Sequence, residues 1–152
     1  MTRVFDSIDA LKAVAGQELG TSDWMTVTQE QVNTFADATG DHQWIHVDPE
    51  RAAKGPFGGP IAHGYLTLSL LPVLAAEIYS VENIAFGMNY GANKVRFPSP
   101  VPVGSRLRAT ATLKETNDIA IGTQVVITFV IEVEGATKPV CIAEVVYVYA
   151  GA

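Results

Sequence analysis

The sequence predicts an α+β fold in which an antiparallel sheet wraps around a long, buried central helix. Apolar side chains in residues 61–80 cover every side of a helical wheel, which is typical of a helix buried within a domain. In residues 106–149, apolar and polar residues alternate in successive segments, and this period of two is typical of strands. Helix and strands thus occupy different parts of the chain, as in α+β domains.

The composition fits one domain with a surplus of apolar residues. The chain has 152 residues, 48% of them apolar and 17% charged, and its mean hydropathy is +0.21. This length predicts a single domain over residues 1–152, large enough to bury a core without metals or disulfides. Cys141 is the one cysteine. The apolar surplus indicates a large subunit interface or an apolar tunnel.

The charge balance argues against several classes of partner. With 10 Lys and Arg against 16 Asp and Glu, the net charge is −6. Because nucleic acids and anionic membranes require clustered cations, neither is expected as a partner. Asp6 and Asp9 interrupt the apolar residues that a secretory signal would need, so we expect a cytoplasmic protein. Glycines and prolines break the uncharged residues 55–76, which argues against a membrane-spanning helix.

The first third of the chain predicts two helices separated by a strand. We expect a helix at residues 7–15 and a strand at residues 22–28. A second helix begins after Thr28, because Thr28 and Gln31 match the capping-box pattern. In that pattern, each of the two side chains accepts a hydrogen bond from the backbone amide of the other residue. Gly40 is expected to end that helix in the left-handed conformation.

Prolines and glycines set the boundaries of the later elements. Asp48 and Pro49 predict another helix start with Asp48 as the N-cap, and Pro72 is expected to kink the long helix. The expected strands after that helix are residues 84–90 and 94–97, followed by a meander whose turns lie at residues 117–122 and 134–139 and whose last strand is residues 140–149.

The densest polar cluster surrounds Asp41 and His46. An acid–base pair must converge within about 2.6–3.2 Å of the proton or water that it handles. On a helix, a separation of five residues turns two side chains about 140° apart, so this pair converges only on a bent loop, which the helix stop at Gly40 provides. Asp41 could instead be a turn residue, and His46 a half-buried histidine bonded to a backbone carbonyl.

Other kinds of chemistry have weaker support. His42, His46, His63 and Asp41 are possible metal ligands, but zinc-site spacing is missing, so no metal is expected. Cys141 lies in a strand pattern and is interpreted as a small apolar core residue rather than a nucleophile. No nucleophile elbow, dinucleotide fingerprint or phosphate-binding loop is present.

His63 and Gly64 stand where the long helix opens. The first amides of a helix have no intrahelical acceptor, so such an end can stabilise a developing oxyanion, and Gly64 would let a substrate carbonyl approach the backbone. The alternative is a glycine that is needed for close packing beneath the sheet.

Taken together, these residues resemble a known motif. The matching positions are Phe35, Gly40, Asp41, Ile45, His46, Asp48 and Pro49, and then Ile61, His63 and Gly64. Their order and spacing resemble the MaoC-like, (R)-specific enoyl-CoA hydratase family, which has the hot-dog fold. Residues 89–97 and 100–104 are similar to a strand and turn of that family. Gln43 and Trp44 depart from the motif, because they replace its Asn and Pro.

The resemblance implies reversible syn hydration of a trans-2-enoyl thioester to the (R)-3-hydroxyacyl thioester, without a cofactor. Asp41 and His46 would activate one water, and the amide of Gly64 would stabilise the thioester oxygen. A homodimer joined edge to edge and an acyl tunnel beside the helix are also implied. The substrate is expected to touch His63, Tyr65, Trp44 and Arg96. Candidates for the CoA phosphates are Lys94, Arg96, Arg106 and Arg108, although solvated surface is the alternative for all four.

Two rival functions remain open. A thioesterase could use the same fold, because a fold does not fix its chemistry. The second rival function is a non-catalytic subunit that binds acyl thioesters. Gln43 and Trp44 would then be signs of a degenerate site.

Overall fold

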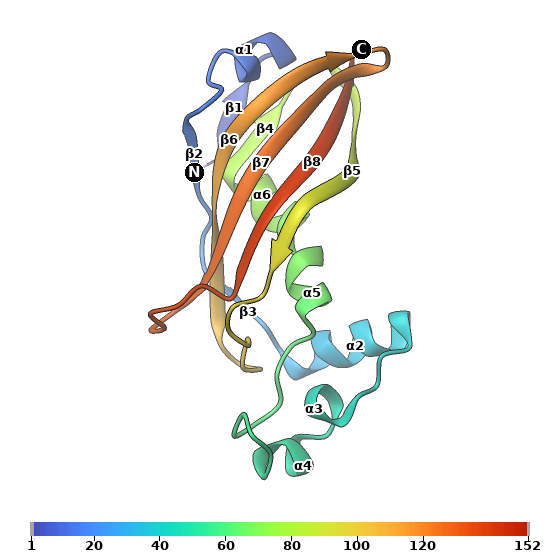
Figure 1. Ribbon diagram of the computed structural model, residues 1–152, viewed down its shortest axis with the longest axis vertical. Helices are drawn as coiled ribbons and strands as arrows, with labels where there is room; N and C mark the ends of the chain where they lie inside the picture. The colour runs from blue at the N-terminus through green and yellow to red at the C-terminus, as the bar shows by residue number, and fades with distance from the viewer. Residues whose placement is uncertain (1, 152) are drawn as a thin grey trace.

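Residues 2–151 are described by a computed structural model built around a six-stranded antiparallel sheet (Figure 1). The strand order is β2-β6-β7-β8-β5, and β3 also pairs with β6. The sheet strands are β2 (Glu18–Thr21), β3 (Met25–Thr26), β5 (Ile84–Arg96), β6 (Arg106–Ile119), β7 (Gly122–Val133) and β8 (Cys141–Gly151). The expected α+β class, with an antiparallel sheet against a helical segment, is confirmed.

The meander β6-β7-β8 follows the predicted period of two. On β6, for example, Leu107, Ala109, Ala111 and Leu113 are fully buried while the residues between them are partly exposed. Gly122 starts β7 after a tight turn, and its φ of 157° suits glycine. A Cβ there would lie 2.0 Å from the carbonyl oxygen of Tyr149, so only glycine lets the two strands approach at this point.

Residues 84–96 form one strand, whereas the sequence predicted two, at residues 84–90 and 94–97. β5 runs unbroken over Ile84–Arg96 and pairs only with β8, so it is an edge of the sheet. The pairing shifts register between Ile84 and Phe86, Asn89 and Gly91, and Ala92 and Lys94. These irregularities blur the alternation in the sequence, because each one moves the following side chains to the other face.

The predicted helix over residues 61–80 is shorter and divided. It consists of α5 (Gly64–Ser69) and α6 (Leu71–Ile78), with the break beside Pro72, which has no amide hydrogen to donate to an earlier turn. Residues 61–63 instead approach the 101–102 segment, since the amide of Ala62 donates to the carbonyl of Val101. Residues 79–81 form β4 (Tyr79–Val81), which pairs in parallel with β1 (Arg3–Phe5).

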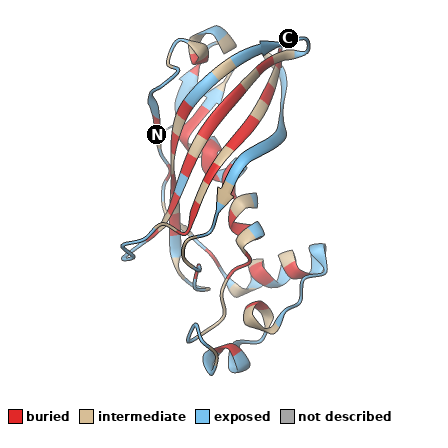
Figure 2. Cartoon of the chain, in the orientation of Figure 1, coloured by how far each residue is buried: buried red, intermediate tan, exposed pale blue. Residues whose placement is uncertain are grey.

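The helical segment is also not buried on every side. Leu66, Leu71 and Leu74 pack into the core, but Tyr65 is 72% exposed and Val73 46% exposed. Figure 1 shows α6 behind the sheet, where it packs against β6 and β2. One face of α5 and α6 therefore completes the core, and an apolar second face remains uncovered in the single chain (Figure 2).

The N-terminal elements confirm most of the predicted caps. Ser7 caps α1 (Ile8–Lys12), and Thr28 caps α2 (Gln29–Thr39) by accepting from the amide of Gln31 at 3.1 Å. Only this half of the capping box forms, since the buried Oε1 of Gln31 has no hydrogen-bond partner within residues 2–151. Gly40 ends α2 with a φ of 83°, as expected.

Of the strand expected at residues 22–28, only β3 at residues 25–26 forms, and the longer strand β2 comes before it at residues 18–21. Between them, the hydroxyl of Ser22 accepts from the amide of Ala109 at 3.0 Å, in place of a backbone carbonyl. The next elements are α3 (Trp44–Val47) and α4 (Pro49–Ala53), which lie with α2 at one end of the sheet (Figure 1). Asp48 caps α4 as predicted, by accepting from the amide of Arg51. Within residues 2–151, no helix is long and apolar enough to span a membrane.

Candidate active site

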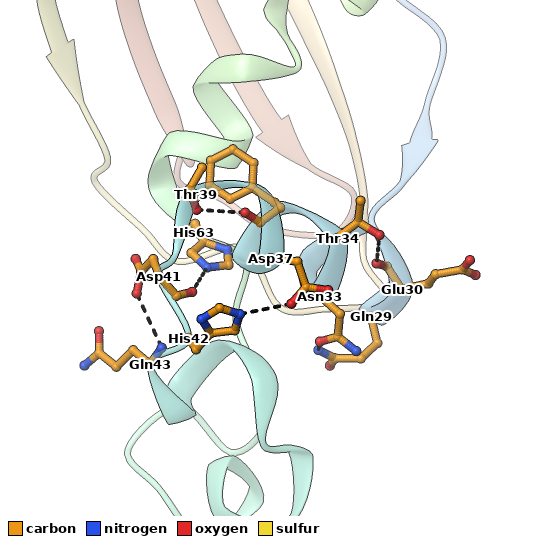
Figure 3. A network of polar contacts seen from close by, with 11 residues as sticks. Gln29, Glu30, Asn33, Thr34, Asp37, Thr39, Asp41, His42, Gln43 and His63 are labelled. Carbon is orange, nitrogen blue, oxygen red and sulfur yellow. Dashed lines mark hydrogen bonds and ion pairs between the residues drawn. The ribbon is translucent and has the colours of Figure 1, made fainter.

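Three elements converge at the end of the molecule that carries α2, α3 and α4. Asp41 follows the left-handed Gly40 at the end of α2, and His46 lies on α3. His63 is the residue just before α5. Figure 3 shows Asp41 and His63 in contact below the sheet. The turn at Gly40 bends the chain back, so residues that are widely spaced in the sequence share one small volume.

The side chains of Asp41, His46 and His63 each place a polar atom within 4.8 Å of the polar atoms of the other two. At such separations one water molecule can hydrogen-bond to a carboxylate oxygen and an imidazole nitrogen together. Both histidines are buried, at 6% exposure for His46 and 3% for His63, while Asp41 faces solvent. The structure therefore brings together the predicted Asp41 and His46 on a bent loop.

The tautomer of His46 follows from its backbone contact. Its Nδ1 lies 2.7 Å from the carbonyl oxygen of Ile61. A carbonyl can only accept, so Nδ1 carries the hydrogen and Nε2 of the neutral ring has a free lone pair. The side chain of Gln29 additionally donates to the carbonyl of His46 at 2.8 Å, which ties α2 to α3. His46 is thus held with one nitrogen available to accept a proton.

His63 has a role that the sequence did not reveal. Its Nε2–H donates to the backbone carbonyl of Asp41 at 2.9 Å and so fixes the loop that carries the carboxylate. Its ring stacks on His46 with centroids 3.9 Å apart and packs against Phe35 at 4.9 Å. The Nδ1 of His63 is buried without a partner within the described residues. We interpret His63 as a residue that positions both Asp41 and His46.

The stacked rings also bear on metal binding. Asp41, His46 and His63 are close enough to be considered as three ligands. However, the two imidazole planes are only 23° from parallel. Lone pairs that lie in nearly parallel, stacked planes do not point at a single ion at the Zn–N distance of about 2.0–2.1 Å. The geometry therefore fits a shared water better than a shared metal ion.

His42, the third histidine, lies outside this cluster. Its Nε2 is 3.0 Å from a carboxylate oxygen of Asp37, on the exposed side of α2 (Figure 3). His42 and Asp37 therefore form a surface pair that resembles the Asp41–His46 pair in chemistry but not in location.

A pocket of about 450 Å³ opens onto the cluster. Its lining residues are Phe35, Thr39, Asp41, His46, His63, Gly64, Tyr65 and Phe97. The sequence predicted five of these as site residues, and it also placed Phe35 in the motif. It missed Thr39 and Phe97. The signals for Phe97 were its place at the end of residues 89–97, which resemble a strand of the family, and beside the Pro-rich residues 98–102.

Gly64 packs against the ring of Phe97. A Cβ at position 64 would lie 3.0 Å from Cδ2 of that ring. The alternative interpretation of Gly64, a glycine needed for close packing, therefore has a specific partner. Gly64 is also the first residue of α5, so its amide has no intrahelical acceptor. This end of α5 lies at the pocket, because Gly64 is one of the lining residues.

The Gly64→Ala substitution is expected to displace Phe97 and narrow the pocket. We expect kcat/KM for a short enoyl thioester to fall about ten- to a hundred-fold, because small misplacements of reacting groups cost rates of this order. Gly59→Ala is the matched control, since a Cβ at Gly59 meets no atom within 4 Å. Steady-state kinetics of both variants test this, and a Gly64→Ala enzyme as fast as the control would contradict it.

Of the other three predicted substrate contacts, one lines the pocket and two do not. Tyr65 lines the pocket. Trp44 lies outside it, because its ring packs on Gly55 and beneath the guanidinium of Arg51, 4.3 Å from the ring centroid. Arg96 is exposed on β5 beside the lining residue Phe97 and donates to the carbonyl of Val95 at 2.8 Å. The substitution of the motif Pro by Trp44 thus stabilises the α3–α4 junction.

Two of the candidate phosphate-binding cations are engaged elsewhere. Arg106 pairs with Glu134 at 3.2 Å and Arg108 with Glu132 at 3.1 Å. The guanidinium carbons of both arginines also lie over the ring of Trp24, at 5.8 and 4.3 Å from its centroid. These two arginines are therefore surface residues, as in the alternative interpretation, and each additionally pairs with a glutamate, which the sequence did not predict.

Cys141 has the environment of a core residue. It is fully buried on β8. Burial raises the pKa of its thiol to about 11, because the thiolate would lose its hydration. At neutral pH the thiol is protonated and shielded, which agrees with its interpretation as a small apolar residue rather than a nucleophile.

Comparison with known proteins places this geometry in a family. The family described as "MaoC like domain" matches residues 11–136, which is most of the chain. The chain belongs to the MaoC-like family. The expected resemblance is confirmed, and so is the hot-dog fold, in which the sheet wraps the helical segment.

Relatives of this MaoC-like protein match nearly its whole length. 3-Hydroxyacyl-thioester dehydratase Z of Mycobacterium tuberculosis is 58% identical over 148 residues, which are 97% of this chain and 98% of that protein. Among solved structures, a monoamine oxidase regulatory protein from Archaeoglobus has a TM-score of 0.78 at 26% identity, covering 100% of this chain and 99% of its own. The (R)-hydratase of A. caviae has a TM-score of 0.70 at 24% identity, covering 88% and 94% respectively, and shows the shared fold.

Proposed function

We propose that this MaoC-like protein catalyses the reversible hydration of a trans-2-enoyl thioester to the (R)-3-hydroxyacyl thioester. The observation that carries the proposal is the meeting of the Asp41 carboxylate and the His46 imidazole in one pocket, within 4.8 Å of each other. The dehydratase from M. tuberculosis, with 58% identity, supports the same reaction class.

The proposed hydration uses one water between Asp41 and His46. The Nε2 lone pair of His46 accepts one proton from this water, while the other hydrogen stays on the water oxygen and donates a hydrogen bond to the Asp41 carboxylate, which orients the water. The water oxygen bonds to C3 as the C2–C3 double bond shifts its electrons toward the thioester carbonyl. The proton held on His46 is then delivered to C2, so the whole water molecule is added. Because one water and one pair of side chains serve both carbons, both additions occur on the same face.

The negative charge that develops on the thioester oxygen needs a donor. The amide of Gly64 is the candidate, because the first amide of a helix has no intrahelical acceptor and the helix dipole favours negative charge there. A donor that stabilises this charge lowers the barrier to forming the enolate, which then takes the proton at C2. No cofactor takes part in the proposed reaction.

A homodimer is part of the proposal. One side of β5 pairs with β8 and the other side is an open sheet edge within the described residues, and its apolar side chains are exposed, Phe86 by 53% and Tyr90 by 65%. Such an edge invites pairing with another strand, and a second copy of β5 would extend the sheet. The exposed face of α6 borders β5, since Pro72 and Ala76 line one pocket together with Gly87 and Met88, and we expect a second copy to bury both.

Dimer formation through β5 predicts that Tyr90→Asp yields a monomer. An aspartate in the joined edge would be buried without a partner, which is costly. Light scattering after size-exclusion chromatography gives the mass directly. Ile121→Asp is the matched control, because Ile121 is 56% exposed at the turn between β6 and β7 and not on the β5 edge. A monomeric wild type, or a Tyr90→Asp protein that stays dimeric, would contradict this edge-to-edge assembly.

The reaction is tested by following enoyl absorbance with crotonyl-CoA. We expect the absorbance to fall to an equilibrium value and the product to be (R)-3-hydroxybutyryl-CoA by chiral analysis. Release of free thiol without loss of the enoyl group would identify a thioesterase instead. Tight binding without either change would identify a non-catalytic subunit, and each of these outcomes overturns the proposal.

A further inference from the structure

His46 lies on a helix that is too short to be stable by itself. α3 spans only Trp44–Val47, about one turn, and the side chain of Gln43 makes no cap at its start. The first turn of a helix fixes several residues for a single hydrogen bond, so isolated helices of this length are unstable in water. Contacts from α3 to other segments must therefore set the position of the His46 ring.

Hydrogen bonds connect α3 to two neighbouring segments. The amide of Ile61 donates to the carbonyl of Ile45 at 3.0 Å, and Nδ1 of His46 donates to the carbonyl of Ile61 at 2.7 Å. These two bonds attach α3 to the segment before α5. From the other side, Nε2 of Gln29 on α2 donates to the carbonyl of His46 at 2.8 Å. Gln29 thus connects α3 to the helix that leads to Asp41.

The orientation of the Gln29 amide follows from its two acceptors. The carbonyl of His46 can only accept, so the nitrogen of the amide must face it. The second hydrogen of that nitrogen is directed at Oδ1 of Asn33, 2.9 Å away and one turn further along α2. Figure 3 shows the two side chains next to each other on α2. Residues four apart share a helical face, so Asn33 can orient the amide that holds His46.

This orientation leaves the amide oxygen of Gln29 without a donor. Its Oε1 is buried and has no hydrogen-bond partner within residues 2–151. A buried acceptor without a donor is destabilising. Rotating the amide would not help, because Oε1 would then face the carbonyl oxygen of His46 and the bond between α2 and α3 would be lost. The bond to His46 is therefore kept although one atom of the amide stays unpaired.

α2 thereby connects both of the side chains that are proposed to act on the water. Asp41 follows Gly40 at the C-terminal end of α2, and Gln29 holds the backbone of His46 from the N-terminal end. The polar atoms of Asp41 and His46 lie within 4.8 Å of each other. A shared water needs both at hydrogen-bond distance, so a displacement of about 1 Å at either one is enough to weaken catalysis.

From these contacts we propose that Gln29 is a positioning residue for the hydration. Its amide holds the backbone of His46 so that Nε2 of the imidazole and the carboxylate of Asp41 contact the same water. This inference rests on the proposed function, because it assigns Gln29 a part in that reaction. Gln29 is not among the described residues that line the pocket, so it acts through His46 and not on the substrate.

The test compares Gln29→Glu with Gln29→Lys by steady-state kinetics with crotonyl-CoA. A carboxylate can only accept, so it cannot hold the His46 carbonyl, and we expect kcat to fall roughly ten-fold with less than about a two-fold change in KM. A lysine ammonium can donate to that carbonyl, so kcat of Gln29→Lys should stay within about three-fold of the wild type. Gln29→Leu removes the donor without adding a charge. It should resemble Gln29→Glu, and it serves if Gln29→Glu does not fold.

The order of these variants separates positioning from a general effect on α2. Gln29 is the first residue of α2, where the positive end of the helix dipole favours a negative over a positive side chain. If Gln29 only stabilised this helix, Gln29→Glu would be the better enzyme and Gln29→Lys the worse one. A Gln29→Glu enzyme at least as fast as Gln29→Lys would therefore overturn the proposal. The control is Gln17→Glu, at an exposed position just before β2, and it should match the wild type.

Repeating the comparison in the His46→Gln variant removes the group that Gln29 positions. There, Gln29→Glu should slow the residual reaction by less than about two-fold, because residues that act through one group are not additive. An equal loss in both backgrounds would show that Gln29 acts elsewhere and would overturn the proposal.

Hydrogen exchange measures the same contact without turnover. The amides of Val47 and Asp48 donate to the carbonyls of Gln43 and Trp44, and their exchange should be faster in Gln29→Glu because α3 opens more often. Unchanged exchange would overturn the positioning role alone. A wild type that does not hydrate crotonyl-CoA would instead overturn the proposed function.

Discussion

Asp41→Asn and His46→Gln are each expected to lower kcat for crotonyl-CoA by about two to four orders of magnitude, the usual contribution of a general acid–base group. Each substitution keeps the size and most of the hydrogen bonding of the side chain but removes its ability to exchange a proton. The folded structure should persist, because Asp41 is exposed and the glutamine that replaces His46 can still hydrogen-bond within the pocket. Enoyl absorbance gives the rate, and circular dichroism and thermal unfolding give the fold.

The surface pair formed by Asp37 and His42 provides matched controls for these two variants. It has the same chemistry and the same five-residue spacing, but it lies outside the pocket, with its polar atoms 3.0 Å apart. Asp37→Asn and His42→Gln should retain the wild-type rate. If Asp41→Asn or His46→Gln turned over substrate as fast as these controls, the proposed role of that residue would be wrong.

The second large effect is expected at His63, although it donates no proton in the proposed reaction. His63→Phe keeps an aromatic ring to stack on His46 but removes the N–H that holds the backbone carbonyl of Asp41 at 2.9 Å. We expect kcat to fall about a hundred-fold through misplacement of the carboxylate, with little change in KM. Stopped-flow or steady-state kinetics over a full range of substrate concentrations separate the two parameters.

His63→Gln distinguishes positioning from substrate binding. A glutamine amide can occupy the place of Nε2 and donate to the Asp41 carbonyl, so this variant should recover part of the lost kcat. The sequence predicted instead that His63 contacts the substrate. If His63 binds the substrate, KM should rise in both His63→Phe and His63→Gln, and kcat should not recover in His63→Gln. That result would contradict the positioning role.

The sequence correctly predicted the elements that depend on residues close to one another in the chain. The meander β6-β7-β8 follows from period-two alternation, because its neighbours pair in sequence order. The caps at Thr28 and Asp48 follow from side chains that bond to amides three residues later. The meeting of Asp41 and His46 was predictable because Gly40 ends the preceding helix and the chain bends directly after it.

The predicted and the observed structure differ where segments far apart in the sequence contact each other. The helix begins at Gly64 rather than at Ile61 because the 61–62 backbone bonds to residues 101–102. It ends before Tyr79 because residues 79–81 pair with β1, which lies near the start of the chain. Phe97 enters the site by packing on Gly64, and His63 bonds to Asp41 across a gap of 22 residues. No periodicity in the sequence reports such contacts.

The most direct test of the central claim is the rate of the Asp41→Asn/His46→Gln double variant with crotonyl-CoA. If both side chains act on the same water, removing the second one costs little once the first is lost, since residues that act as a unit are not additive. We therefore expect the double variant to be about as slow as the slower single variant. A rate reduced by the product of the two single effects would show that the side chains act independently and would contradict the shared-water mechanism.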